Sequence, residues 1–387
     1  MFQHTSFRRS RGCVVLLLAL LLSSCGSNSS PTATVQPATA TAPAPATATL
    51  AAPTVAPTEA ATATLAGPTA APPLAATATL GANSFQNPVL KQDFPDPFVL
   101  LDGGVYYAYA TNGIGKNIQA AQSPDLVHWT LEPDAMPALP KWAKLGGSYV
   151  WAPEVIANAG HYLMYFTARD KASNKQCVGV AEGDTPGGPF LDTRTAPLVC
   201  QADEGGTIDP SPFRDGDTLY LYYKNDGNCC NKPTYLYVQP LAADGLSLTG
   251  TATQLVRNDA LWEGNVVEAP TMVKHNDKYY LFFSANNYAG FEYAVGYATC
   301  AAAVGPCQDA PENPILASKM DSPPLVIGPG HQSVITIGGK TWIVYHVWQV
   351  SASGTRGSNR FLWIDPLTWT DGKPDVQGPT TGPQPIP

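Results

Sequence analysis

Residues 96–109 read DPFVLLDGGVYYAY: an acidic residue, a short apolar strand, a tight turn and a strand rich in aromatic residues. Apolar runs of this length, bounded by Gly and Asp, are typical of a β-hairpin. The same order recurs four more times along the chain, at residues 154–166, 209–223, 268–283 and 331–345. This stretch therefore predicts the repeating unit of the whole fold.

The five hairpins follow one another at intervals of about 55 to 63 residues, and hairpins that recur at a period of roughly 40 to 50 residues or more are typical of a β-propeller. No long stretch keeps a helical period of apolar residues. We therefore expect an all-β fold, a five-bladed β-propeller that occupies residues 85–387. Each blade is one sheet, which must pack against its neighbours to bury both faces.

The propeller geometry predicts where the polar residue of each repeat lies. The innermost strand of a blade lines the central channel, so the residue in front of that strand falls at one mouth of the channel. Carboxyl groups that are brought together there perturb one another's pKa values, as acid–base chemistry requires. One such residue is expected from each repeat: Asp96, Glu154, Asp209, Glu268 and His331.

The N-terminal residues predict export. A basic stretch precedes the apolar residues 13–22, which are fewer than the roughly 20 that span a bilayer and are typical of a signal peptide. Small residues in front of Cys25 resemble a bacterial lipoprotein box. We therefore expect residues 1–25 to be a lipoprotein signal peptide that ends at a lipidated Cys25, with the protein anchored at the cell surface. The alternative is an ordinary signal peptide, cut near Ser27, and a secreted protein.

The next segment, residues 26–84, is dominated by Thr, Ala and Pro and carries Glu59 as its only charge. Such a segment cannot bury a core and should remain a disordered, extended tether. The formal net charge of the chain is −8, with no cluster of Lys and Arg after the signal. This balance argues against nucleic acid as a partner, because phosphate binding needs a basic surface.

Six cysteines follow residue 85, and an even number in an exported chain suggests disulfides. Cys300 and Cys307 enclose a short loop and are the pair that we expect to be bonded. The pairing of the adjacent Cys229 and Cys230 stays open. No spacing of Cys and His predicts a zinc site.

Several short motifs, taken in order, resemble those of glycoside hydrolase family 43, whose members are five-bladed propellers that cleave arabinose- and xylose-containing glycans. The motifs are Phe94-Pro95-Asp96-Pro97-Phe98, Ile208-Asp209-Pro210-Ser211, Val267-Glu268-Ala269-Pro270, Gly330-His331 and the closing segment 359–367. The resemblance implies that Asp96 is the general base, that Asp209 tunes the acid and orients the sugar, and that Glu268 is the general acid. It also implies that His331 lies near the channel axis, close to a water or a structural calcium ion, and that Arg360 faces the substrate.

The implied mechanism is inversion at the anomeric carbon. Asp96 would take a proton from the attacking water while Glu268 protonates the departing oxygen, with the two carboxyl groups about 6.5–9.5 Å apart. A neighbouring Asp209 carboxylate would favour the protonated form of the acid. Asp-Pro pairs can also merely begin turns. Asp93 is an alternative base that lacks the following proline, and Glu154 is interpreted as a structural acid.

Three aromatic residues near the motifs are candidate sugar-binding platforms, since sugar rings stack their C–H faces on aromatic side chains: Phe94, Trp151 and Trp262. Ordinary core packing is the alternative for each of them.

The expected activity is that of an α-L-arabinofuranosidase or arabinanase that needs no cofactor and acts as a monomer. Its partner would be a plant cell-wall polysaccharide such as arabinan, arabinoxylan or xylan. We prefer arabinose over xylose as the released sugar because no β-sandwich follows the propeller. The alternatives are a β-xylosidase of the same family and a surface propeller that binds glycans without cleaving them. Exo or endo cleavage would depend on loops near residues 141–149 and 225–232.

Overall fold

The computed structural model describes residues 83–387, apart from residues 114, 147–148 and 322. The predicted signal peptide, Cys25 and residues 26–82 of the predicted tether lie outside the described residues. Within the described part, no helix is long and apolar enough to cross a membrane. The helical segments of this part are short 3₁₀ turns: η1 (Ala202–Glu204), η2 (Gly227–Cys230) and η3 (Leu261–Glu263).

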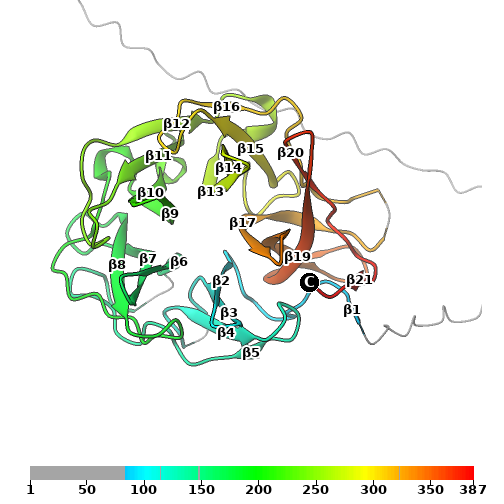
Figure 1. The fold of residues 1–387 in the computed structure, drawn as a ribbon, viewed down its shortest axis with the longest axis horizontal. Coiled ribbons are helices and arrows are strands. Elements are labelled where there is room, and N and C mark those ends of the chain that lie inside the picture. Colours follow the sequence, from blue (N-terminus) through cyan, green and yellow to red (C-terminus); the bar gives the residue numbers. More distant parts are fainter. Residues whose placement is uncertain (1–82, 114, 147–148, 322) are drawn as a thin grey trace, which may run out of the picture. The chain divides into compact units, whose positions relative to one another are not determined.

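Five antiparallel sheets surround a central axis in the described part of the chain (Figure 1), which confirms the predicted five-bladed β-propeller. In each blade the first strand along the chain is innermost and the later strands follow outwards. Blades 1 and 2 consist of β2 (Phe98–Asp102), β3 (Val105–Ala110), β4 (Gln119–Ser123) and β5 (Thr130–Leu131), and of β6 (Trp151–Asn158), β7 (His161–Arg169) and β8 (Gln176–Gly183). Blade 3 consists of β9 (Thr207–Asp215), β10 (Thr218–Asn225), β11 (Tyr235–Pro240) and β12 (Thr253–Arg257).

The chain continues into blade 4 and then into blade 5, from which it returns towards the first described residues. Blade 4 consists of β13 (Val267–His275), β14 (Lys278–Ala285), β15 (Ala294–Cys300) and β16 (Cys307–Asp309). Blade 5 consists of β17 (Ile327–Ile337), β18 (Lys340–Val350), β19 (Arg356–Thr370) and β20 (Lys373–Val376).

Apolar contacts between neighbouring blades hold the ring together. Alternate residues of a strand point to opposite faces of its sheet, so the second strand of a blade packs against both neighbours. In β14, Leu281 and Phe283 join a buried cluster with blade 3, while Tyr280 and Phe282 join one with blade 5. Such clusters lie between all neighbouring blades. Burial on both faces is the reason why the second strand of each repeat is almost continuously apolar.

The ring is closed by the first described residues. β1 (Ser84–Phe85) pairs with β21 (Gln384–Pro385). The chain then runs beside β19, where the amide of Phe94 donates a hydrogen bond to the carbonyl of Arg360 over 2.8 Å. The N-terminal segment thus joins blade 5 before it enters blade 1, and the two ends of the propeller are tied to each other.

The innermost part of each blade contains one residue, not a glycine, with a left-handed φ between 46° and 56°. These residues are Asp96, Ala152, Asp209, Ala269 and His331. In blades 2 to 5 the pairing of the first two strands is irregular at this point. The structure thereby corrects the predicted alignment of the repeats, because Glu154 lies two residues after the equivalent position and Glu268 lies one residue before it.

Three disulfides are formed among the described residues. The predicted Cys300–Cys307 bond is confirmed and joins β15 to β16. Cys177 is bonded to Cys200. Cys229 and Cys230, whose pairing the sequence left open, are bonded to each other in η2.

Candidate active site

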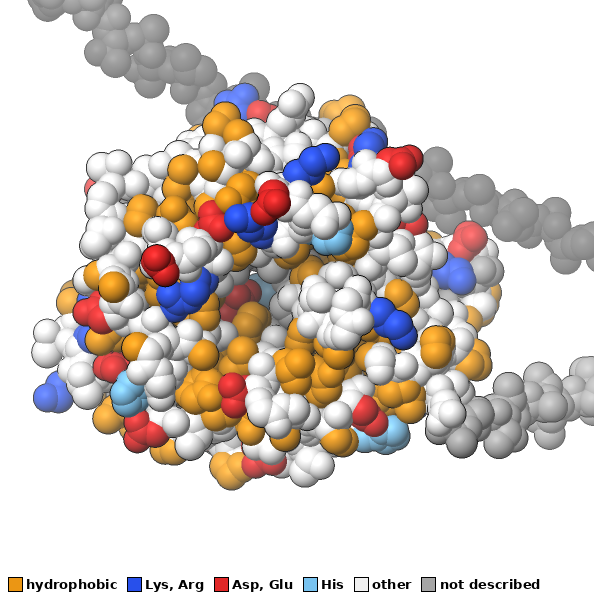
Figure 2. All heavy atoms as spheres, viewed as in Figure 1, with side chains coloured by type: hydrophobic (Ala, Val, Ile, Leu, Met, Phe, Trp, Pro, Cys, Tyr) orange, Lys and Arg blue, Asp and Glu red, His pale blue; other side chains and the backbone are white. Residues whose placement is uncertain are grey.

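A cavity of about 530 Å³ opens at one mouth of the channel. Figure 2 shows it as a hollow in the middle of this face, with acidic and histidine side chains inside it. All five blades contribute to its walls. The lining residues are Asp93, Pro95, Asp96, Thr111, Asn112, Trp151, Arg169, Ile208, Asp209, Asp226, Asn228, Cys229, Glu268, Tyr288, His331 and Arg360.

Asp96 is surrounded by hydrogen-bond donors and positive charge. Arg360 Nη1 donates to its Oδ1 over 2.7 Å, and Thr111 Oγ1 donates to its Oδ2 over 2.5 Å. The Nδ1 atoms of His331 and His346 each lie 3.4 Å from Oδ1. Burial alone would raise the pKa of Asp96, but Arg360, His331 and the Thr111 hydrogen bond together hold it well below its ordinary value. Asp96 is therefore a carboxylate at neutral pH. Burial lowers the pKa of His346 well below its ordinary value, so His346 is uncharged and its Nδ1 accepts the amide of Asp96.

Asp209 lies in the opposite electrostatic situation. Its Oδ2 accepts a hydrogen bond of 3.0 Å from the amide of Ala269. Burial and the neighbouring Glu268 carboxyl raise the pKa of Asp209 to about 6, against the lowering effect of His331 and Lys224. Asp209 therefore holds its proton more strongly than an ordinary aspartate, next to the Glu268 carboxyl group.

Glu268 is held by two side chains. Tyr293 donates its hydroxyl to Oε1 over 2.7 Å, and the Lys224 ammonium lies 3.2 Å from Oε2. Lys224 is fully buried, and its other hydrogen bond goes to Asn228 Oδ1 at 2.8 Å. A buried lysine must be paired to remain charged, so Lys224, Asn228 and Glu268 form one connected group.

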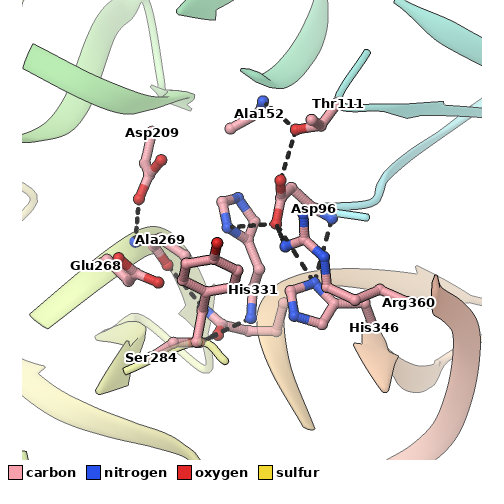
Figure 3. Close-up of polar contacts among 12 residues, drawn as sticks. Asp96, Thr111, Ala152, Asp209, Glu268, Ala269, Ser284, His331, His346 and Arg360 are labelled. Atoms are coloured by element: carbon pink, nitrogen blue, oxygen red, sulfur yellow. Dashed lines mark hydrogen bonds and ion pairs between the residues drawn. The ribbon is translucent and has the colours of Figure 1, made fainter. Parts of the chain in front are cut away.

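The carboxyl groups occupy two sides of the pocket. Figure 3 shows Asp209 and Glu268 on one side, Asp96 with Arg360 and His346 on the other, and His331 between them. Two carboxyl environments with opposite effects on the proton thus face one cavity, which is the arrangement that acid–base catalysis uses.

Hydrogen bonds across the blade boundaries fix the left-handed residues. The amide of Ala152 donates to Thr111 Oγ1 over 3.0 Å, and the amide of His331 donates to Ser284 Oγ over 2.8 Å. The amide of Asp96 donates to His346 Nδ1 over 3.2 Å. A left-handed residue other than glycine costs on the order of 1–3 kcal/mol, and these contacts, each from a neighbouring blade, compensate for it. The positions of the acids therefore depend on the assembled ring.

Two of the predicted sugar platforms do not line the cavity. Phe94 is 0% exposed and packs in the apolar cluster between blades 5 and 1. Trp262, in η3, packs on Phe283 with 5.5 Å between ring centroids and lies against the backbone of Gly296. Both aromatic rings pack against the core, because the adjacent blade covers the apolar faces next to the inner strands.

Trp151, His331 and Arg360 do line the cavity, as the sequence predicts for them. Asp93 lines it too, but its Oδ1 accepts the amide of Arg360 over 2.8 Å and so helps to close the ring. Glu154 is not among the lining residues. Burial raises its pKa well above the ordinary value, against a hydrogen bond with Ser211.

Sequence reasoning missed several residues of the site. Lys224, Tyr293 and His346 come from the outer strands or from loops, not from the motif in front of an inner strand. A usable signal existed for Lys224, because a charged residue directly follows the apolar run LYLYY. Tyr288 was also missed; it is 48% exposed, lines the cavity and stacks on Trp348 with 6.1 Å between centroids.

The residues around His331 offer few oxygen ligands for the calcium ion that the resemblance implies. Calcium prefers about six to eight oxygen ligands, whereas His331 offers a nitrogen and the oxygens of Asp96 are already bonded to Arg360 and Thr111. We assign no step to a metal ion, and the calcium expectation stays a prediction. Among the described residues, one group of three closely spaced carboxylates lies elsewhere, in the connection between blades 3 and 4 and in β16: Asp259, Glu263 and Asp309.

A second cavity of about 960 Å³ continues from the first. The two share Asn228, Glu268 and Tyr288. Amide and charged side chains dominate its walls, which include Asn231, Lys232, Arg257, Asn258, Asp259, Asn265, Asn286, Asn287 and Glu292. Glu268 therefore stands at the junction of two polar spaces.

A channel-mouth pocket with paired carboxyl groups in a five-bladed propeller defines a class of glycan-cleaving enzymes. The sequence profile of the glycosyl hydrolases family 43 matches residues 85–374. The chain belongs to this family and is a glycoside hydrolase.

Individual relatives agree with this assignment. A solved structure of a thermostable family-43 glycoside hydrolase is 34% identical, with a TM-score of 0.71, over 78% of this chain and 99% of that chain. The β-D-galactofuranosidase of Aspergillus niger is 30% identical over 305 residues, covering 74% of this chain and 82% of that protein. A probable arabinan endo-1,5-α-L-arabinosidase C of Aspergillus flavus is 29% identical over 71% of this chain and 88% of that protein.

Proposed function

We propose that the chain hydrolyses glycosidic bonds with inversion, with Asp96 as general base and Glu268 as general acid. The observation that carries the proposal is the contrast between the two carboxyl environments in one pocket. Arg360 and Thr111 keep Asp96 ionised, while burial and the Glu268 carboxyl group raise the pKa of Asp209, beside the proposed acid, to about 6. Titratable groups whose surroundings separate their pKa values are the usual mark of an acid and a base.

Asp96 would accept the proton of the attacking water. Its Oδ1 and Oδ2 are each anchored by one donor, Arg360 and Thr111, so the carboxylate is held in a fixed orientation. Arg360 is itself held in place by the rings of Tyr288 and Trp348, 5.2 and 5.5 Å from its guanidinium carbon. A positioned base of this kind contributes about 10²- to 10⁴-fold to the rate.

Glu268 would give its proton to the departing oxygen. The reaction leaves a carboxylate on Glu268, and the Lys224 ammonium, 3.2 Å from Oε2, is placed to stabilise that developing charge. Tyr293 fixes the other oxygen. Asp209 acts as a positioning residue, because it accepts a hydrogen bond from the amide of Ala269 next to the acid. Its negative charge disfavours ionisation of the neighbouring acid.

The two cavities suggest how a glycan chain would lie. The released sugar would occupy the smaller cavity, between Asp96 and Glu268, since both groups must reach its anomeric carbon or the bonded oxygen. The leaving group would extend from Glu268 into the larger cavity, whose amides and charges can hydrogen-bond sugar hydroxyls. This larger space favours a polymer or oligosaccharide over a small aglycone.

The substrate class that we propose is the α-L-arabinofuranosyl linkage of arabinan and related plant polysaccharides. The similarity to the Aspergillus flavus arabinosidase supports it. The similarity to the Aspergillus niger enzyme favours β-D-galactofuranosyl linkages as the second candidate. The two sugars share one ring configuration and differ in the exocyclic group, so one pocket can accept either. A β-xylosidase activity is the remaining alternative.

A hydrolysis screen tests the function. The purified protein would be incubated with arabinan, arabinoxylan, xylo-oligosaccharides and the aryl glycosides of α-L-arabinofuranose, β-D-galactofuranose and β-D-xylose. Release of arabinose is the expected result, and release of another single sugar would reassign the substrate. If no substrate is hydrolysed but the polysaccharides are bound, the result would favour a surface propeller that binds glycans without cleaving them.

A further inference from the structure

The Cys229–Cys230 disulfide is an unusual component of the pocket. A bond between adjacent cysteines closes a ring within the local backbone and joins no separate segments. In the chain-entropy view, the stability that a disulfide adds grows with the length of the loop it closes. The other two bonds close loops with sequence separations of 23 and 7, but this bond has a separation of 1. Stabilisation of the fold therefore does not account for it.

Its position points to the ligand instead. Cys229 is exposed and lines the smaller cavity together with Asp96, Asp209 and Glu268. The disulfide sulfurs are soft and apolar. A furanose or pyranose ring has polar edges and an apolar C–H face, so the pocket needs apolar surfaces. Trp151, Ile208 and Tyr288 supply part of this surface, and Cys229 adds the sulfur surface of the disulfide to it.

The turn that carries the disulfide is firmly held. The amide of Asp226 donates to the carbonyl of Gly206 over 3.0 Å, and the amide of Lys232 donates to the carbonyl of Gly227 over 2.9 Å. Gly227 is enclosed, since a Cβ there would lie 2.3 Å from the carbonyl oxygen of Pro233. Cys230 Sγ lies 3.3 Å from Lys175 Nζ in blade 2. The disulfide is thus a fixed surface and not a loose loop tip.

The same turn touches the group around the proposed acid. Asn228, the residue before Cys229, accepts the Lys224 hydrogen bond at 2.8 Å, and Lys224 pairs with Glu268. Asn228 lines both cavities. A sugar that rests against the disulfide would therefore lie beside Glu268, where the scissile oxygen has to be.

We propose that the Cys229–Cys230 disulfide is a sugar-binding surface of the pocket, against which the apolar face of the bound glycan packs beside Glu268. The inference rests on the proposed function for the class of ligand. It makes the disulfide a determinant of substrate affinity and leaves the chemical step to the carboxyl groups.

The test compares two pairs of substitutions in the full-length protein. In Cys229→Ser/Cys230→Ser we expect KM to rise about tenfold, which corresponds to about 1.4 kcal/mol, with kcat within about threefold of wild type. The matched control is Cys300→Ser/Cys307→Ser, which removes a disulfide outside the pocket and should leave KM unchanged while lowering Tm. Cys229→Leu/Cys230→Ala restores an apolar surface without the bond and should recover part of the lost affinity.

Binding is measured separately from turnover, by calorimetric titration of each variant with 1,5-α-L-arabinotriose and with xylotriose. A weaker Kd in the serine pair, with the control at the wild-type value, supports the proposal even if no substrate is turned over. An unchanged Kd and KM in the serine pair would overturn it, as would an equal loss in the control pair. Failure of the leucine–alanine pair to bind better than the serine pair would also contradict an apolar contact, and a wild type that binds neither trisaccharide would contradict it as well.

Discussion

At the scale of single residues, the pocket places two carboxyl groups, the proposed base and the proposed acid, in different surroundings. Asp96 is kept ionised by Arg360 and Thr111, and Glu268 is placed between Tyr293 and Lys224. The motifs predicted Asp96, Asp209, Glu268, His331 and Arg360 as pocket residues, because each belongs to a short recurring pattern. They could not predict the partners of these residues, which come from other strands and are brought close only by the closed ring.

The two acid–base residues give the sharpest residue-scale prediction. Asp96→Asn and Glu268→Gln should each lower kcat by at least about 10²-fold without a large change in Tm, since both substitutions keep the shape of the side chain. The loss in Glu268→Gln should be smaller with a dinitrophenyl leaving group, which needs no proton. Glu154→Gln is the matched control, at a half-buried acid that does not line the cavity. Near-normal rates in the first two variants would exclude Asp96 and Glu268 as base and acid.

Asp209 should control the pH dependence. Burial and the Glu268 carboxyl group raise the pKa of Asp209 to about 6. The two carboxyl groups repel each other when both are ionised, and ionisation of the proposed acid sets the alkaline limb of the rate profile. In Asp209→Asn this repulsion is gone, the acid ionises more readily, and the alkaline limb should move to lower pH. A kcat profile across pH 4 to about 9 measures it, and an alkaline limb in the wild-type position would remove the proposed role of Asp209.

Lys224 provides a further prediction that the motifs did not supply. Lys224→Met keeps the length of the buried side chain but removes the ammonium beside Glu268 Oε2. The charge that develops on Glu268 then lacks its partner, and kcat should fall about 10- to 10²-fold. The free energy of unfolding should fall as well, because one partner of a buried ion pair is removed, so kcat is measured at a temperature where urea titration shows the variant to be folded. A kcat equal to that of the wild type would show that Lys224 serves only the packing of blade 3.

At the scale of the elements, the hairpins could be predicted from the sequence but their alignment could not. The recurring pattern of an apolar strand, a turn and an aromatic strand gave the blades, because burial on both faces demands it. The irregular pairing at Ala152 and Ala269 leaves no pattern of its own, since alanine is not a usual residue for left-handed backbone. The prediction therefore aligned Glu154 and Glu268 with Asp96, although the two alanines are the equivalent residues.

The packing between blades can be tested within one blade. Phe282 is fully buried between blades 4 and 5, so Phe282→Ala should lower the free energy of unfolding by about 3–5 kcal/mol. Phe291 is 61% exposed in the same blade, and Phe291→Ala should change it by less than about 0.5 kcal/mol. Urea titrations of both variants make the comparison, and equal effects would contradict the assignment of the interblade cluster as core.

At the scale of the whole molecule, the ring closure was not foreseen. The pairing of β1 with β21, and of the segment before Asp96 with β19, joins residues almost 300 positions apart, and no local pattern reports such a contact. The number of blades, by contrast, follows from counting repeats. The propeller matters for the site because each wall of the pocket belongs to a different blade.

A further prediction concerns Cys25, which lies in the part of the chain before the propeller. If Cys25 is lipidated, Cys25→Ser should release the exported protein from membranes, while Ser27→Ala, which keeps the proposed lipid site, should not. Fractionation of cells that express each variant measures the effect. Persistent membrane association of Cys25→Ser would contradict the lipoprotein interpretation and leave the activity of the propeller untouched.

The central claim is that Asp96 and Glu268 act on opposite sides of the scissile bond. The most direct measurement follows the anomer that is released first from an aryl α-L-arabinofuranoside, or from the glycoside that the screen identifies, by proton NMR during the first turnovers. The account predicts the inverted product, β-L-arabinofuranose from the α-linked substrate, before mutarotation mixes the anomers. First release of the retained α anomer would contradict it, because retention requires a carboxylate nucleophile and not a base that activates water.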